Sequence, residues 1–122
     1  LKTAEILSGP RNLRGACPMT AEFRLKITGV GKGLVQLRAR RGRELLYEGP
    51  EQELAEEPQE QRIVLPVTQP KDVADYQQFI QKVEFEVRAK PKSQASSRLY
   101  PLRKKIAPYL WQASCITIEE KR

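Results

Sequence analysis

The stretch that decides the fold is Lys82-Val83-Glu84-Phe85-Glu86-Val87-Arg88-Ala89-Lys90. Apolar and charged residues alternate along it without a break, and this period of two is typical of a β-strand with one buried face. The pattern predicts that the four apolar side chains face a core and that the five charged ones face water. A shift of one residue would bury all five charges, so the pairing of this strand should be strongly specified. We therefore expect a central strand.

The same alternation recurs in several short segments on either side. We expect strands at residues 20–28, 34–39, 43–47 and 62–68, an edge strand at 99–105 that contains Pro101, and a last strand at 111–118. Glycine and proline pairs separate many of these segments, as they do at turns. Short strands divided by turn signals are typical of an all-β sandwich or barrel.

Two segments depart from the strand pattern. Residues 1–16 contain Gly9-Pro10 and are expected to form a partly ordered leading segment with a short edge strand near residues 4–7. In residues 72–82, Val73, Tyr76 and Ile80 fall on one face of a helix, and Asp72 suits its N-cap. We therefore expect one short helix that crosses between sheets.

Length and net charge limit the kinds of protein that this chain can be. At 122 residues it is expected to form a single domain, residues 1–122. No apolar run approaches the roughly 20 residues of a membrane-spanning helix, so we expect no transmembrane segment. The net charge of +7 favours acidic partners such as nucleic acid, anionic lipid, cell-wall polymer or an acidic protein. The simpler alternative is that the charges are solvated and keep the protein soluble.

The charged residues are clustered along the chain. Basic residues form two candidate binding groups, Arg38, Arg40, Arg41 and Arg43 in the first and Arg103, Lys104 and Lys105 in the second. The first group is expected on a β-hairpin with arginines at its tip. Acidic residues gather in an expected exposed loop at 51–61, where the candidate contacts are Glu51, Glu53, Glu56 and Glu57.

The chain has two cysteines, one near each end of the strand pattern. Cys17 comes just before the first regular strand, and Cys115 lies in the last one. These strands can be neighbours in a sandwich, so a disulfide is feasible, and closing so long a loop stabilises by about 4–5 kcal/mol in the chain-entropy model. Such a bond would place the domain outside the reducing cytosol. The alternative is two separate buried thiols.

Residue types that catalysis needs are scarce. The chain has no histidine, which excludes the Ser-His-Asp and Cys-His constellations. Two isolated cysteines without histidine do not make a zinc site. The carboxylates at 51–60 are expected on an exposed loop, whereas paired catalytic carboxylates need a rigid separation. We therefore expect a protein that is not an enzyme and has no metal or cofactor.

A set of segments carries a resemblance to a known family. It comprises Cys17-Pro18-Met19-Thr20-Ala21-Glu22-Phe23, Gly33-Leu34-Val35-Gln36-Leu37-Arg38, residues 83–91 and Cys115. With these segments the chain resembles immunoglobulin-like or fibronectin-III-like β-sandwich domains of bacterial exported proteins. The resemblance implies an immunoglobulin-like sandwich of about seven strands, in which a Cys-Pro cysteine pairs with one in the last strand. It also implies an adhesive, scaffolding or partner-binding role.

Three functions stay open on the sequence alone. The first is a non-catalytic extracytoplasmic module, secreted or periplasmic with any signal peptide absent from this sequence, that binds a protein or an anionic envelope component. The second is a basic nucleic-acid-binding β-barrel of the OB type, whose arginines would follow phosphates. The third is an inhibitor or immunity-type protein that uses the acidic loop. The first is favoured over the second because the aromatic residues that would stack on bases are more easily assigned to the core.

Overall fold

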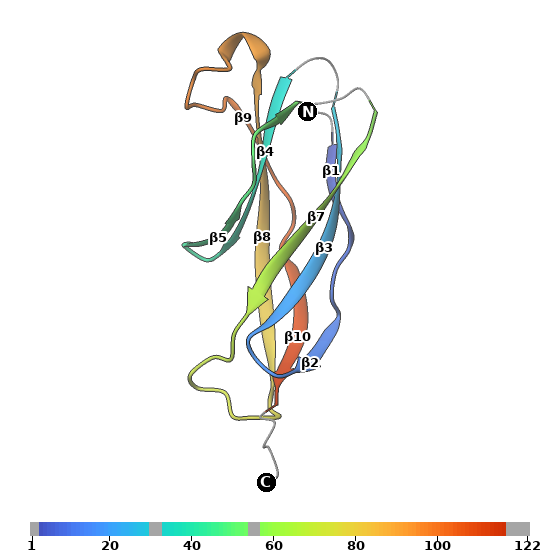
Figure 1. Ribbon diagram of the computed structural model, residues 1–122, viewed down its shortest axis with the longest axis vertical. Coiled ribbons are helices and arrows are strands. Elements are labelled where there is room, and N and C mark those ends of the chain that lie inside the picture. Colours follow the sequence, from blue (N-terminus) through green and yellow to red (C-terminus); the bar gives the residue numbers. More distant parts are fainter. Residues whose placement is uncertain (1–2, 30–32, 54–56, 117–122) are drawn as a thin grey trace.

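The computed structural model describes residues 3–29, 33–53 and 57–116, which fold into two packed β-sheets (Figure 1). The smaller sheet has the order β1 (Thr3–Ser8), β3 (Met19–Thr28), β7 (Gln59–Val67). The larger sheet has the order β2 (Asn12–Gly15), β10 (Tyr109–Cys115), β8 (Gln78–Pro91), β4 (Gly33–Arg41), β5 (Glu44–Glu48). Two short strands are added to it, β6 (Gln52–Glu53) on β4 and β9 (Leu102–Lys105) on β8. The predicted all-β sandwich class is confirmed.

β8 is the long central strand predicted from the alternation at 82–90, and it begins earlier, at Gln78. Its side chains Val83, Phe85 and Val87 point inward and are almost completely buried. β8 pairs with β4 along one side and with β10 and then β9 along the other. The larger sheet is therefore built around this strand.

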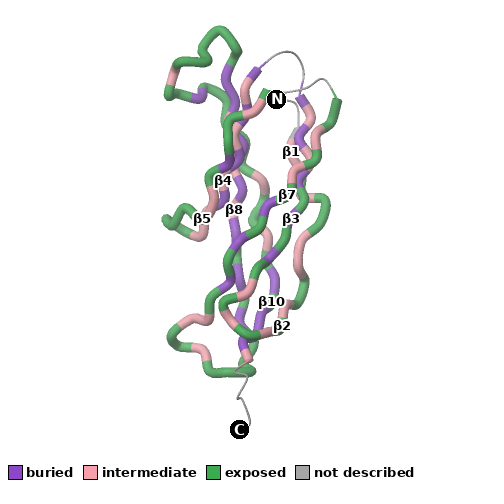
Figure 2. The backbone as a smooth tube through the Cα atoms, viewed as in Figure 1, coloured by how far each residue is buried: buried purple, intermediate pink, exposed green. Residues whose placement is uncertain are grey.

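The alternating pattern also located the strands beside and opposite β8. β3 pairs with β7 from Met19 opposite Val67 to Ile27 opposite Gln59. β4 pairs with β8 from Gly33 to Arg40. Buried and less buried residues alternate along these strands, as the colours of Figure 2 show. The strands predicted at 20–28, 34–39, 43–47 and 62–68 are confirmed.

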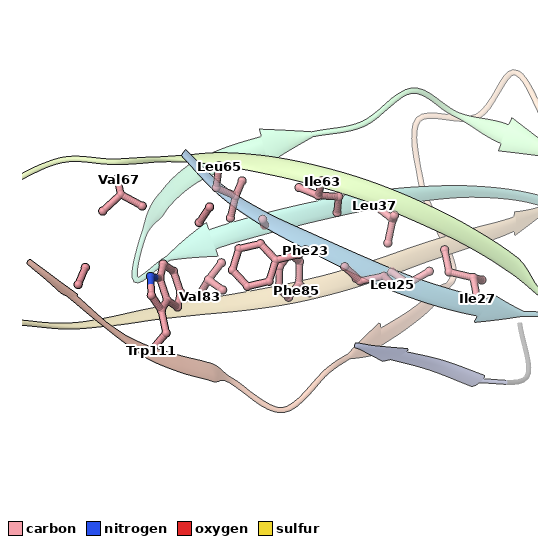
Figure 3. Packing of buried hydrophobic residues seen from close by; sticks show 14 of the residues in the cluster. Phe23, Leu25, Ile27, Leu37, Ile63, Leu65, Val67, Val83, Phe85 and Trp111 are labelled. Atoms are coloured by element: carbon pink, nitrogen blue, oxygen red, sulfur yellow. The ribbon is translucent and has the colours of Figure 1, made fainter. Parts of the chain in front are cut away.

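Aliphatic side chains and a cluster of aromatic rings fill the core between the two sheets (Figure 3). Three rings meet Phe23 edge-on, at centroid distances of 5.1 Å for Phe85, 5.4 Å for Tyr109 and 5.4 Å for Trp111. Edge-to-face pairs of this kind add about 0.5–1.5 kcal/mol each beyond the burial of area. Phe23 is completely buried. This one ring on β3 of the smaller sheet therefore packs against both β8 and β10 of the larger sheet.

The predicted helix at 72–82 is wrong. Residues 71–77 contain turns, and residues 78–82 belong to β8. Tyr76 has a φ of 66°, in the left-handed region that a right-handed helix excludes. From Phe79 onward the chain pairs with β10, which sets Phe79 opposite Ala113 in the core. This pairing outweighs the weak helical preference of so short a segment.

The leading segment forms two strands, which extends the predicted edge strand at 4–7. β1 pairs antiparallel with β3 in the smaller sheet, whereas β2 pairs parallel with β10 in the larger sheet. The chain passes between the sheets at Gly9, where an added Cβ would lie only 2.8 Å from the Cζ atom of Tyr109. The crossing therefore depends on a residue without a side chain.

Cys17 and Cys115 form a disulfide, with their Cα atoms 5.4 Å apart. Cys17 precedes β3 of the smaller sheet, and Cys115 ends β10 of the larger one. The bond therefore joins the two sheets at one end of the sandwich, and the predicted pairing is confirmed.

β9 and β10 follow one another along the same edge of β8, with a change of register between them (Figure 1). Lys105 lies opposite Glu86 and Tyr109 lies opposite Val83, so four steps along this edge match three steps along β8. The extra residue falls at 106–108, as in a β-bulge. β9 confirms an edge strand within the predicted range 99–105. β10 confirms the last strand up to Cys115, and residues 117–118 lie outside the described residues.

Candidate anion-binding surface

The fold brings the two predicted basic groups to the two sides of one strand. β4 and β9 flank the same part of β8, so that Glu86 has Arg38 opposite on one side and Lys105 opposite on the other. Neighbouring strands lie about 4.8 Å apart, which sets the β4 and β9 backbones about 10 Å from each other. Residues about 65 positions apart in the chain therefore contribute to one surface.

Side-chain alternation decides which basic residues share a face. On β4, Val35, Leu37 and Ala39 are buried, so Arg38 and Arg40 point to the outer face of the larger sheet. Arg103 and Lys105 lie opposite the outward residues Arg88 and Glu86 and point the same way. We call Arg38, Arg40, Arg103 and Lys105 the basic surface.

The other three predicted residues do not belong to this face. Lys104 lies opposite the inward residue Val87, so it points to the other side of the sheet. Arg41 has the inward parity of Ala39, and its Nε is buried without a hydrogen-bond partner in the described chain. Arg43 is exposed in the turn that joins β4 to β5, where Gly42 takes a φ of 59°.

Most of the basic surface lacks an acidic partner of its own. The Arg38 Nη2 atom pairs with the Glu48 Oε2 atom at 3.2 Å. Among the described residues, Arg40, Arg103 and Lys105 form no ion pair. A hollow of about 190 Å³ lies between the two halves, lined by Arg40, Gly42, Glu84, Phe85, Glu86 and Lys105. Two cations therefore face an open space beside two carboxylates.

A buried lysine at the end of β8 was not anticipated. The alternation predicted that Lys90 faces water, but its side chain is only 2% exposed. Its Nζ atom pairs with the Glu51 Oε2 atom at 3.2 Å and donates to the carbonyls of Ala95 and Ser97 at 3.1 and 2.6 Å. The connection from β8 to β9 folds over this ammonium group, because its carbonyls and Glu51 replace the water that the charge would otherwise need. These contacts fix the connection that leads from β8 into β9.

Tyr100 completes this cluster. Its hydroxyl donates to the Glu51 Oε2 atom at 2.5 Å, and the centroid of its ring lies 4.3 Å from the Arg88 guanidinium carbon. Burial raises the pKa of Tyr100, and the hydrogen bond to Glu51 raises it further. The hydrogen bond from Tyr100, followed by that from Lys90, lowers the pKa of Glu51. The cluster therefore holds a neutral tyrosine and an ionised carboxylate. No sequence motif indicates it, because its members come from three separate segments.

Two carboxylates of the expected acidic loop form ion pairs with lysines of the same chain. Glu51 belongs to the Lys90 cluster, and a Glu53 Oε1 atom lies 2.9 Å from the Nζ atom of Lys92. Residues 52–53 form β6, so the segment is not all loop. Glu57 is exposed, and Glu56 lies outside the described residues. Two of the four candidate carboxylates therefore have intramolecular partners, which weakens the inhibitor hypothesis.

The described part of the chain contains no group of acidic residues and cysteines that could hold a metal ion. Nor does it contain a helix long and apolar enough to cross a membrane. Comparisons of the chain with protein-family models, with curated proteins and with solved structures found no match.

Proposed function

We propose that this protein is a non-catalytic module that binds an anionic partner, either an acidic protein or an anionic envelope component, through the basic surface. The observation that carries the proposal is the convergence of Arg40, Arg103 and Lys105 on one face without ion-pair partners in the described chain. Basic residues that outnumber the neighbouring carboxylates on a face raise the local concentration of anionic partners and speed association with them.

The strand order supports the proposal of an immunoglobulin-like sandwich. The larger sheet contains β10-β8-β4-β5 and the smaller one β1-β3-β7, an order that corresponds to G-F-C-C′ and A-B-E in immunoglobulin folds. The disulfide differs, because antibody domains link the strands that correspond to β3 and β8. In this chain the bond joins the segment before β3 to β10.

The disulfide also supports an extracytoplasmic location. Structural disulfides persist in oxidising compartments and are rare in the cytosol. We therefore propose that the protein works as a secreted or periplasmic module, as the resemblance to exported domains implies.

Binding to defined polyanions tests the proposal. Poly-glutamate represents an acidic protein, a glycerol-phosphate polymer represents an envelope component, and a single-stranded oligonucleotide serves as the comparison. We expect affinity for one of the first two to fall steeply with salt. The Arg40→Gln, Lys105→Gln double variant should bind several-fold more weakly, because both side chains line the hollow of the basic surface.

The matched control removes the same number of charges from the other sheet. Arg24 and Arg62 are exposed on β3 and β7 and pair with Glu60 and Glu22, so the Arg24→Gln, Arg62→Gln double variant should bind normally. Equal losses of affinity in both double variants would show that binding depends only on net charge, and would contradict the proposal. A clear preference for the oligonucleotide would replace it with nucleic-acid binding.

A further inference from the structure

We propose that the outer edge of β9 binds an extended acidic segment of a partner protein, which adds to the larger sheet as a further strand. This rests on the proposed function, because it names the kind of anionic partner and where it docks. Peptides that add to a sheet edge gain affinity from main-chain hydrogen bonds and selectivity from side chains at alternate positions.

The register identifies the backbone groups that β9 offers. The Ile106 N–H donates to the Phe85 carbonyl at 2.9 Å, and hydrogen-bonded pairs alternate along an antiparallel ladder. Lys104 opposite Val87 is therefore the next hydrogen-bonded pair. The N–H and C=O groups of Arg103 and Lys105 then face away from β8. Within residues 3–29, 33–53 and 57–116, no strand pairs with that edge.

The side chains of β9 specify an alternating partner. Arg103 and Lys105 point to the outer face, where Arg103 lies directly opposite Arg88. Like charges directly opposite one another are unfavourable, and a partner carboxylate beside Arg103 would relieve this repulsion. Leu102 is 53% exposed and has the opposite parity. A segment with acidic residues at every second position and apolar residues between them matches both sides.

β9 differs from the other edge strands of the described chain. All four of its residues are exposed, and three in a row are basic. β5, at the opposite edge of the sheet, begins and ends with glutamate. Two copies of β9 paired antiparallel would bring basic side chains together, so self-association at this edge is disfavoured. An acidic strand would meet no such repulsion at β9.

Titration of the full chain with a capped peptide of alternating glutamate and valine tests the proposal. The decisive probes are two N-methylated versions, one methylated at the glutamates and one at the valines. In a paired strand alternate N–H groups face β9, so one version should lose about tenfold or more in affinity while the other stays within about twofold. Loss in the glutamate version identifies an antiparallel partner, and loss in the valine version a parallel one. Equal affinities for the two versions would overturn the proposal.

Two double variants place the site. Arg103→Gln with Lys105→Gln should weaken peptide binding about threefold to tenfold, whereas Arg24→Gln with Arg62→Gln on the other sheet should leave it within about twofold. The opposite ranking would overturn the β9 site. If the peptide fails to bind while polyanions bind in a salt-dependent way, the docking proposal falls and the proposed function stands. If neither binds, both fall.

Discussion

β10 and β9 run along the same edge of β8, yet their outer sides differ. On β10, the Gln112 N–H faces away from β8 and donates to the Arg11 carbonyl at 3.0 Å, beside the parallel strand β2. On β9, the corresponding N–H groups of Arg103 and Lys105 meet no strand of the described chain. One sheet edge is therefore closed along part of its length and open along the rest.

The difference separates stability from recognition. The closed part contains the buried Trp111 and ends at the disulfide. The open part has no residue in the core cluster and is held by the connection over Lys90. Changes in the closed part should therefore unfold the protein, whereas changes in β9 should alter binding and leave the fold intact.

Loss of the disulfide should have the largest effect. The Cys17→Ser, Cys115→Ser double variant opens a loop with a sequence separation of 98 residues, so we expect a loss of about 4–5 kcal/mol in unfolding free energy. Denaturant titration measures it. A loss below about 1 kcal/mol would show that the closed part does not depend on its covalent link.

Truncation of the central ring should come next. Phe23→Ala removes a fully buried side chain that meets three other rings, and we expect a cost of about 3–5 kcal/mol. Leu102→Ala on β9 is the comparison, and its cost should stay within about 0.5 kcal/mol because the side chain is mostly exposed. Equal costs in thermal or chemical unfolding would contradict the division between the two parts.

Proline substitutions in β9 test the register with a smaller effect. Lys104→Pro removes an N–H that bonds to Val87, so we expect a cost of about 1–3 kcal/mol. Arg103→Pro removes an N–H that faces solvent, a position that prolines on edge strands tolerate, so we expect a change within about 0.5 kcal/mol. If Arg103→Pro costs more than Lys104→Pro, the hydrogen-bond phase of β9 is the reverse of the one described.

The Lys90 cluster should give β9 a pH dependence. The folded pKa of Glu51 lies below its ordinary value of 4.5, so its contribution is present above that value and is lost as pH falls through the lowered pKa. The folded pKa of Tyr100 lies above 10.0, so its contribution is lost only as pH rises through the raised pKa. The NMR signals of residues 95–105 should therefore stay constant between these limits and change outside them.

Two variants test which group sets each pH limit. Glu51→Gln should abolish the change on the acid side, and Tyr100→Phe should abolish the change on the alkaline side. Unaltered pH profiles in both variants would mean that other groups hold the connection to β9.

The sequence was most informative where one face of a strand is buried. The alternation of residues 83–89 and 21–27 reflects a core on one side and water on the other, and both became strands of the sandwich. The prediction from sequence was wrong for residues 72–82, where a helical spacing over so few residues is weak evidence beside the pairing of Phe79 and Gln81 with β10. Local pattern does not report distant partners.

The candidate site was only half predictable. Its basic residues are visible in the sequence, but their convergence depends on strand order, which sets β4 and β9 on either side of β8. The burial of Lys90 was hidden for the same reason, since its partners Glu51, Ala95 and Ser97 come from other segments. The alternation predicts which way a side chain points, and not what later covers it.

Amide hydrogen exchange, followed by NMR, tests the central claim that the sheet edge is closed by β2 along β10 and open along β9. We predict slow exchange for the amides of Gln112 and Lys104 and fast exchange for those of Arg103 and Lys105. Saturation with the alternating acidic peptide should protect Arg103 and Lys105 and leave Gln112 unchanged. Slow exchange of Arg103 and Lys105 in the free protein, or no protection by the peptide, would contradict the account.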